Sequence, residues 1–387
     1  MTQYLGLEKG DLESLKAFWT AKEIEQQPSC WKKTFAIVND FRPVINTFLE
    51  LAFAHPELRI VLTGAGTSAF AGRALAPALT KVVGGRVEAI ATTDIVSNPH
   101  HYFAEDIPTL VVSFARSGNS PESVAAVELA NQVLTNCYHL ILTCNHQGEL
   151  YQRCSLDQRS FALLMPEETN DKSFAMTSSF SSMMLAAFSI FAGENAFAKE
   201  IERLCKCSEA LIKEINLPIS NIAGRNTGRV IYLGSGCFQG LAQESALKLL
   251  ELTAGKVVAC FDSPLGFRHG PKSIVDNQTL IVVFISNDPY TRKYDLDLLK
   301  ELRRDNIASC VVAITSQIDE VVTEGEYIHV DNMDMASDVE LLFPYMLFAQ
   351  IYAFHRSLVL GNTPDNPCPT GEVNRVVQGV TIHKFKN

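Results

Sequence analysis

The sequence has little of what marks secreted, membrane-spanning or nucleic-acid-binding proteins. Its ten cysteines include no Cys-x-x-Cys pair, and the first ten residues show no apolar core of a secretory signal. We therefore expect reduced thiols and a cytoplasmic protein. No apolar run approaches the roughly 18 residues of a membrane span. The net charge of −10 argues against a nucleic-acid-binding domain but not against a local site for a phosphorylated ligand.

Metal-binding patterns are also missing. The closest cysteines, Cys205 and Cys207, are expected on a helix surface rather than at a metal, and no other group of Cys, His, Asp and Glu has the spacing of a metal site. We expect no metal.

What the sequence does contain is an internal repeat. The 387 residues exceed one ordinary core, which favours two domains. Two strand-plus-glycine segments, Arg59–Ser68 and Arg229–Phe238, resemble each other. Three more pairs recur at nearly the same offset along the chain: Thr109–Ser117 with Thr279–Asn287, Val87–Ile90 with Val257–Cys260, and His139–Thr143 with Val311–Thr315. The repeat indicates an internal duplication.

Each half alternates continuous Val/Ile/Leu runs with helical stretches, the pattern of parallel strands buried on both faces. The clearest predicted helices cover residues 69–82, 121–133 and 239–254, with a helix and linker over 195–222 and a buried helix over 341–354. The predicted fold class is α/β, with two tandem doubly wound parallel-sheet domains. We expect an N-terminal helical segment over 1–56, a first domain over 57–215, and a second domain over 216–387 that ends in a loop-like tail.

Two loops of the first half have the chemistry of a phosphate site. Gly64–Ser68 and Arg116–Glu122 each follow a predicted strand and open a helix, where backbone N–H groups favour an anion. The candidate binding residues are Gly66, Thr67, Ser68, Arg116, Ser117 and Ser120. Such loops also occur without a ligand, and the glycine spacing departs from the GxGxxG of a dinucleotide site. The second-half counterparts lack the serines, so we expect one half to bind phosphate and the other to supply the chemistry.

Acid–base groups are concentrated in the second half. Spacings of four and three residues place Glu244, Lys248 and Glu251 on one helix face. The simplest interpretation is a Glu244–Lys248 ion pair on a solvated face. His269 follows in a Gly/Pro-bounded loop and is either catalytic or an ordinary surface residue. A carboxylate and a histidine would suffice to open a sugar ring and move a proton between C1 and C2.

Together these residues resemble the sugar isomerase (SIS) domain family. The two loops, with Glu244–Glu251 and Arg268–Pro271, are similar to the isomerase half of glucosamine-6-phosphate synthase. Longer strings resemble the galactosamine-6-phosphate deaminase/isomerases, also labelled tagatose-6-phosphate ketose/aldose isomerases, over nearly the whole chain. These strings are Thr63–Phe70, Ser113–Glu128, Phe174–Ser178 and Asn374–Val380.

The resemblance implies a role for each candidate residue. Glu251 would shuttle the proton between C1 and C2, with Lys248 as its polar neighbour. His269 would open the ring in the site of the partner subunit of a homodimer. The phosphate would bind to Thr67, Ser68, Ser117 and Ser120, and Met176 and Thr177 would lie along the sugar. No cofactor is implied.

Two departures from the synthase narrow the expected function. The chain starts at Met1-Thr2 without the glutaminase domain, and Gln378 stands where the synthase has the lysine that forms a Schiff base. Both favour the breakdown of an aminoaldose over glutamine-dependent synthesis.

The resemblance thus implies isomerising deamination of galactosamine 6-phosphate to tagatose 6-phosphate and ammonia. A ketose/aldose isomerase that releases no ammonia is one alternative. A sugar-phosphate-binding regulator is another, although the first fifty-odd residues show no basic helix-turn-helix pattern. The preference for galacto or gluco sugars depends on contacts to the C4 hydroxyl, which the sequence does not locate.

Overall fold

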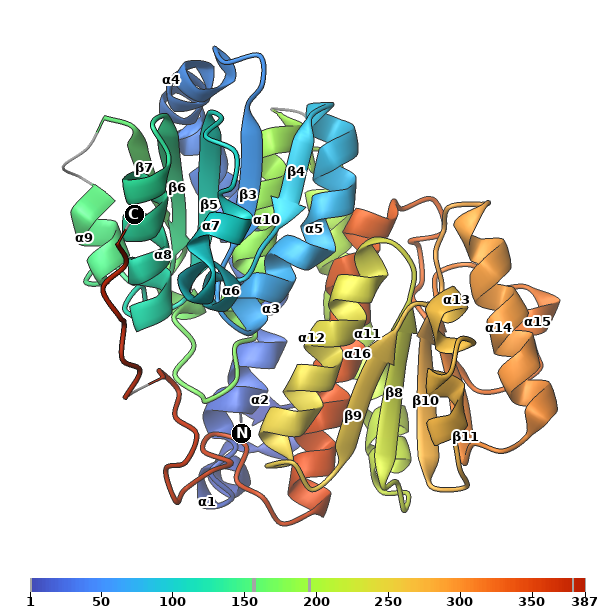
Figure 1. The fold of residues 1–387 in the computed structure, drawn as a ribbon. Coiled ribbons are helices and arrows are strands. Elements are labelled where there is room, and N and C mark those ends of the chain that lie inside the picture. Colours follow the sequence, from blue (N-terminus) through green and yellow to red (C-terminus); the bar gives the residue numbers. More distant parts are fainter. Residues whose placement is uncertain (1, 155–157, 194–195, 378, 387) are drawn as a thin grey trace. The chain divides into compact units, whose positions relative to one another are not determined.

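The computed structural model describes residues 2–154, 158–193, 196–377 and 379–386. The chain divides into two compact units (Figure 1). We call them the first-sheet unit (Ser29–Asp171, Met176–Ile201 and Thr370–Asn387) and the second-sheet unit (Met1–Pro28, Lys172–Ala175 and Glu202–Pro369).

The first-sheet unit is built on five strands in the order β4-β3-β5-β6-β7, and all neighbouring strands are parallel. The strands are β3 (Arg59–Thr63), β4 (Arg86–Ala89), β5 (Thr109–Ala115), β6 (Cys137–Thr143) and β7 (Ser160–Leu164). The helices are α3 (Gln27–Asp40), α4 (Arg42–Phe53), α5 (Thr67–Val83), α6 (Thr92–Ser97), α7 (Pro99–Tyr102), α8 (Pro121–Val133), α9 (Glu149–Cys154), the 3-10 turn η1 (Glu167–Thr169) and α10 (Ser178–Ala192).

The second-sheet unit repeats this arrangement, with strand order β9-β8-β10-β11-β12. The strands are β8 (Arg229–Gly234), β9 (Val258–Asp262), β10 (Thr279–Phe284), β11 (Cys310–Thr315) and β12 (Tyr327–His329), preceded by the short antiparallel pair β1 (Gln3–Tyr4) and β2 (Leu7–Glu8). The helices are α1 (Lys9–Ser14), α2 (Phe18–Glu25), α11 (Ile201–Ala223), α12 (Cys237–Leu252), α13 (Pro264–Phe267), the 3-10 turn η2 (Pro271–Ile274), α14 (Thr291–Asp305), α15 (Glu320–Thr323) and α16 (Asp338–Val359).

The two sheets confirm the predicted α/β class. β8 begins at Arg229 and β10 at Thr279, and these starts are separated from those of β3 (Arg59) and β5 (Thr109) by one constant offset, as the internal duplication predicts. The helices predicted over 69–82, 121–133 and 239–254 are present as α5, α8 and α12, and α8 has the predicted bounds.

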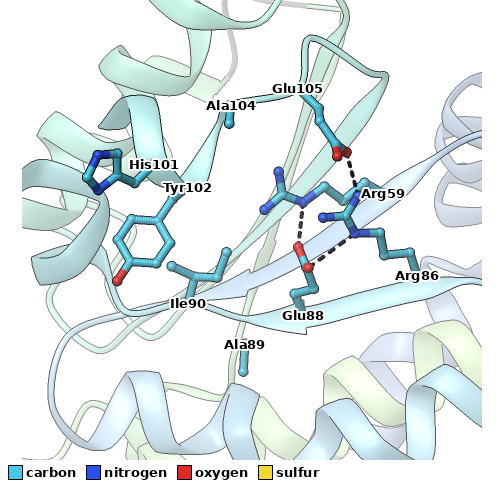
Figure 2. A pocket seen from close by; sticks show the side chains of 9 residues that line it. All are labelled: Arg59, Arg86, Glu88, Ala89, Ile90, His101, Tyr102, Ala104 and Glu105. Atoms are coloured by element: carbon cyan, nitrogen blue, oxygen red, sulfur yellow. Dashed lines mark hydrogen bonds and ion pairs between the residues drawn. The ribbon is translucent and has the colours of Figure 1, made fainter. Parts of the chain in front are cut away.

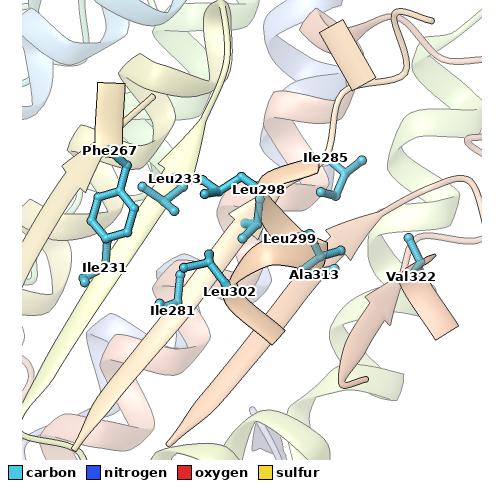
Figure 3. Close-up of a cluster of buried hydrophobic side chains, with 11 residues drawn as sticks. Ile231, Leu233, Phe267, Ile281, Ile285, Leu298, Leu299, Leu302, Ala313 and Val322 are labelled. Carbon is cyan, nitrogen blue, oxygen red and sulfur yellow. The ribbon is translucent and has the colours of Figure 1, made fainter. Parts of the chain in front are cut away.

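Both faces of the second sheet are covered, which explains its continuous apolar strands. Figure 3 shows one face, where Ile231 and Ile281 pack with Leu298, Leu302 and their neighbours on α14. On the other face the rings of Tyr232, Phe238, Phe284 and Tyr345 lie 5.1–6.4 Å apart between centroids. α16 is buried along most of its length, as predicted for residues 341–354, and starts with a capping box of Ser337 and Glu340.

One cysteine position differs from expectation. Cys205 on α11 is fully buried, whereas Cys207 is half-buried. Residues two apart on a helix point in divergent directions, so only one of them can face the core. The predicted surface position is therefore wrong for Cys205. All ten cysteines are free.

Within the described ranges, none of the helices combines the length and hydrophobicity required to cross a membrane.

Candidate active site

The strand order determines where a ligand can approach the first sheet. β3 pairs with β4 on one side and with β5 on the other. The chain therefore crosses from β3 to β4 in one direction and from β5 to β6 in the opposite direction. Ligands of such sheets bind at this switch point, beyond the carboxyl ends of the strands. The loops after β3 and β5 are the two predicted phosphate loops.

A cavity of about 100 Å³ lies between these loops. It brings together five of the sequence-predicted residues: Ser68, Arg116, Ser117, Ser120 and Met176. Gly66 and Thr67 adjoin it as the N-cap and first residue of α5. Thr177 does not line the cavity; it is buried at the start of α10, where its backbone N–H donates to Asp171 Oδ2 at 2.8 Å.

The backbone of both loops requires glycine. Gly66 has φ +56° and Gly118 has φ +68°, in the left-handed region that favours glycine. A Cβ on Gly118 would also lie 3.2 Å from the Gly148 Cα. Ser120 and Pro121 then start α8, and the Ser120 hydroxyl donates to Ser123 Oγ at 2.6 Å. Two helix N-termini thus flank the cavity, an arrangement that favours an anion.

Arg116 links the second loop to the C-terminal tail. Its side chain is only 6% exposed, and Nη2 donates to the Arg375 carbonyl at 2.7 Å. Arg375 in turn donates through Nε to the Asp171 carbonyl at 2.9 Å and through Nη2 to Asn170 Oδ1 at 3.2 Å. Burial raises the pKa of the Asp171 carboxyl, although hydrogen bonds from Ser179 and the charge of Arg116 oppose the shift.

The tail residues Arg375, Val376 and Val377 line the cavity and were missed as site residues by the sequence reasoning. The signal that could have found them is the string Asn374–Val380, which carried part of the family resemblance. Gln378 lies outside the described residues.

In the second sheet the equivalent loops are filled by the protein's own carboxylates. Asp295 accepts hydrogen bonds from the Ser235 hydroxyl (2.5 Å) and the Ser286 N–H (2.9 Å). Asp338 accepts from the Ser286 hydroxyl (2.5 Å) and the Asn287 N–H (2.8 Å). Burial raises the pKa of Asp295 to about 6, against the effect of these hydrogen bonds, and raises that of Asp338 too. These hydroxyl and N–H donors of the second-sheet loops are therefore already hydrogen-bonded to carboxylates of the protein.

The acidic and basic groups of α12 form a buried cluster. Glu244 and Lys248 are each 1% exposed, and Lys248 Nζ lies 3.4 Å from Glu244 Oε1. Lys248 also pairs with Glu251, which is 22% exposed. The single face predicted by spacing is present, but a solvated ion pair is wrong, because α12 packs between α16 and the strands β8 and β9. A buried ammonium group needs such compensation.

His269 lies in the same unit but apart from this cluster. Its side chain is exposed just after α13, where Phe267 packs with α14. α12 lies with α16 on the opposite face of the sheet, where Phe238 contacts Tyr345 (Figure 1). Within one chain, Glu251 on α12 and the turn after α13 that carries His269 therefore lie on opposite faces of the second sheet.

A different cavity, of about 390 Å³, adjoins the edge strand β4 (Figure 2). Its charges neutralise one another: Glu88 pairs with Arg59 at 2.6 Å and with Arg86 at 3.1 Å, and Arg86 pairs with Glu105 at 2.7 Å. It extends along β4, from Arg59 and Arg86 at the amino ends of β3 and β4 to Ala89 and Ile90 at the carboxyl end of β4, and its two arginines are balanced by its two glutamates.

No group of three or more His, Cys, Asp or Glu side chains within the described part of the chain is arranged to hold a metal ion.

Comparison with known proteins gives the family. The SIS domain model matches residues 53–192 and 225–359. The chain belongs to the SIS domain family. Of its relatives, the D-galactosamine-6-phosphate deaminase AgaS of Escherichia coli is 49% identical over 369 residues, covering 95% of this chain and 96% of that protein. The resemblance inferred from the residues is confirmed.

Solved structures agree with this assignment. The tagatose-6-phosphate ketose/aldose isomerase of Escherichia coli superimposes with a TM-score of 0.89 at 46% identity, covering 95% of this chain and 97% of that one. The C-terminal domain of glucosamine-fructose-6-phosphate aminotransferase from Francisella tularensis shares the fold, with a TM-score of 0.75 at 18% identity, covering 90% and 98% of the two chains.

The raised pKa of Asp295 predicts a specific pH dependence of stability. Between pH 4 and 6 the unfolded state has released this proton and the folded state still holds it, so stability falls as pH rises, by up to about 1.4 kcal/mol per pH unit. In Asp295→Asn, this contribution to the decrease in stability should be absent. The measurement is the free energy of unfolding in urea at pH 4, 5, 6 and 7. Asp297→Asn, exposed on the same helix, is the control. If the free energy of unfolding of Asp295→Asn depended on pH as strongly as that of the unchanged chain, the raised pKa of Asp295 would be contradicted.

Proposed function

We propose that this SIS-family protein converts galactosamine 6-phosphate to tagatose 6-phosphate and ammonia. The observation that carries the proposal is 49% identity, over 95% of the chain, to a D-galactosamine-6-phosphate deaminase. The open anion cavity of the first sheet and the buried carboxylate cluster of α12 support it. We further propose a homodimer that acts in the cytoplasm, where the ten free thiols would stay reduced.

The first-sheet loops hold the substrate phosphate in this proposal. The hydroxyls of Thr67, Ser68, Ser117 and Ser120 donate to its oxygens, together with N–H groups that begin at Gly66 and open α5. The guanidinium of Arg116 adds a buried positive charge beside the cavity. Met176 and Thr177 lie along the sugar.

Glu251 carries the proton in the proposed reaction. After ring opening exposes the C1 aldehyde, its carboxylate removes the C2 proton and returns a proton to C1. The C2–N bond becomes an imine, water adds at C2, and ammonia leaves to give the ketose. Lys248, paired with both Glu244 and Glu251, orients the Glu251 carboxylate.

His269 opens the sugar ring in the site of a partner subunit. The support within one chain is that α12, which carries Glu251, and the turn after α13, which carries His269, lie on opposite faces of the same sheet, together with the exposure of His269. Imidazole side chains exchange protons near neutral pH, which suits proton transfer at the ring oxygen.

A ketose/aldose isomerase that releases no ammonia is the second candidate. The name of the solved Escherichia coli relative, 46% identical to this chain, favours it. The two functions share every step up to C1 protonation and differ in whether an amine stands at C2.

A coupled assay separates these functions. Purified protein is incubated with galactosamine 6-phosphate, with glucosamine 6-phosphate alongside, and both ammonia and ketose 6-phosphate are measured. We expect ammonia and ketose in equal amounts from the galacto substrate. Interconversion of tagatose 6-phosphate with an aldose, without ammonia, would establish the simple isomerase. If the protein bound these sugar phosphates but converted neither of them, it would be a sugar-phosphate-binding regulator.

Glu251→Gln should lower kcat by about 10²–10⁴-fold, because the amide cannot accept the C2 proton. Binding of the phosphosugar, measured by calorimetry, should stay within a few-fold of the unchanged chain. Glu209→Gln, exposed on α11, is the matched control and should retain full activity. Turnover that survives in Glu251→Gln would remove this carboxylate from the mechanism.

Mixed dimers test the shared site. Co-expression of Glu251→Gln and His269→Ala chains with different affinity tags allows the heterodimer to be purified. One of its two sites would then contain both intact groups, so we expect up to about half the activity per dimer, although each homodimer is nearly inactive. Verified heterodimers without activity would show that each site is completed within one chain.

A further inference from the structure

A second cavity with the character of an anion site lies in the second-sheet unit. It has a volume of about 600 Å³, within the range typical of small-molecule sites. It is formed by α1, α2 and the segment that follows α16. Its lining is Lys9, Glu13, Lys16, Phe18, Trp19, Lys22, Asp365 and Asn366.

Three ammonium groups converge on two aromatic rings at this cavity. Lys9 and Lys22 lie 5.2 and 6.0 Å from the Phe18 ring centroid, and Lys22 and Lys172 lie 5.2 and 4.2 Å from that of Trp19. The two rings are themselves 5.0 Å apart. Ring faces attract cations, whereas like charges on neighbouring side chains repel one another, and an anion bound beside them would reduce that repulsion.

The nearby carboxylates offset only part of this charge. Asp365 is occupied at the start of α2, where its oxygens accept from the Trp19 N–H (3.1 Å), the Thr20 N–H (2.8 Å) and the Thr20 hydroxyl (2.8 Å). Glu13 lies 3.5 Å from Lys9. Among the described residues, no ion pair joins Lys16, Lys22 or Lys172 to a carboxylate.

Glu23, close to Lys172, is also committed elsewhere. It is buried, and its carboxylate accepts hydrogen bonds from the Lys172 and Ser173 backbone N–H groups and from the Ser173 hydroxyl. The Lys172 side chain instead extends over Trp19. The lining residues Lys9, Lys16 and Lys22 carry three positive charges against the two negative charges of Glu13 and Asp365, which leaves a net charge of +1 on a chain whose net charge is −10.

We propose that this cavity binds a small organic phosphate and is a second ligand site, separate from the proposed site for the substrate phosphate. Lysine ammonium groups bind phosphate as point charges and do not demand one fixed orientation. The half-buried rings of Phe18 and Trp19 offer apolar surface to the carbon part of the ligand. The ammonium groups of Lys22 and Lys172, both over the Trp19 ring, can contact different oxygens of one phosphate group.

Tryptophan fluorescence tests the proposal directly. The chain has two tryptophans; Trp19 lines the cavity, and Trp31 is fully buried and donates to Ser181 Oγ. Titration of the full chain with pyrophosphate, and with inorganic phosphate for comparison, should give a saturable change that is absent in Trp19→Phe. Lys22→Gln/Lys172→Gln should raise the apparent Kd for pyrophosphate at least tenfold, and Lys16→Gln should raise it less.

Two control variants distinguish this site from other sources of the signal. Lys293→Gln/Lys300→Gln removes the same charge from exposed positions of α14 and should leave the titration within twofold. Arg116→Ala/Ser117→Ala impairs the proposed substrate site and should also leave the apparent Kd of the fluorescence titration within twofold. Calorimetry of this variant should still detect one pyrophosphate site per chain. A response that does not saturate, survives in Lys22→Gln/Lys172→Gln, or disappears in Arg116→Ala/Ser117→Ala would overturn the proposal.

Discussion

Parallel pairing of the strands is the constraint on which the rest of this structure depends. Consecutive parallel strands can be joined only by a crossover, so each sheet requires helices on both faces and apolar strands between them. The same pairing brings the carboxyl ends of all strands to one edge. Strand–loop–helix junctions along that edge present backbone N–H groups outward, and a phosphate site needs little beyond small residues and one buried arginine.

The duplicated sheets share one architecture but differ in what fills the loops at the switch point. Both have the same strand order, and both have loops at the switch point. In the first sheet a cavity with Arg116 remains between those loops, whereas in the second Asp295 and Asp338 occupy the corresponding donors. An internal carboxylate thus stands where a ligand anion could have been, and the second sheet instead carries the carboxylate cluster of α12.

Burial strengthens the ion pairs of that α12 cluster. On an exposed helix, residues spaced like Glu244, Lys248 and Glu251 would form weak ion pairs that water and salt screen. Here Lys248 is buried on a helix that packs against α16 and the sheet, so the ammonium group must keep both carboxylates close, and Glu251 is the most exposed of the three. A partly exposed carboxylate held by a buried cation has a defined orientation, which is consistent with the proton transfer proposed for Glu251.

The α/β class, the internal repeat with its constant offset, the bounds of α8 and the residues of the two loops at the first-sheet switch point could all be predicted from the sequence. These features are encoded by neighbours along the chain, through periodicity, helix-start residues and self-similarity. The burial of Lys248, the position of Asp338 in the second-sheet loop and the contact of Arg375 with Arg116, 259 residues away, follow from the three-dimensional fold and could not be predicted. The reason is physical: such contacts join residues far apart in sequence, and no local pattern records which distant segment will cover a given face.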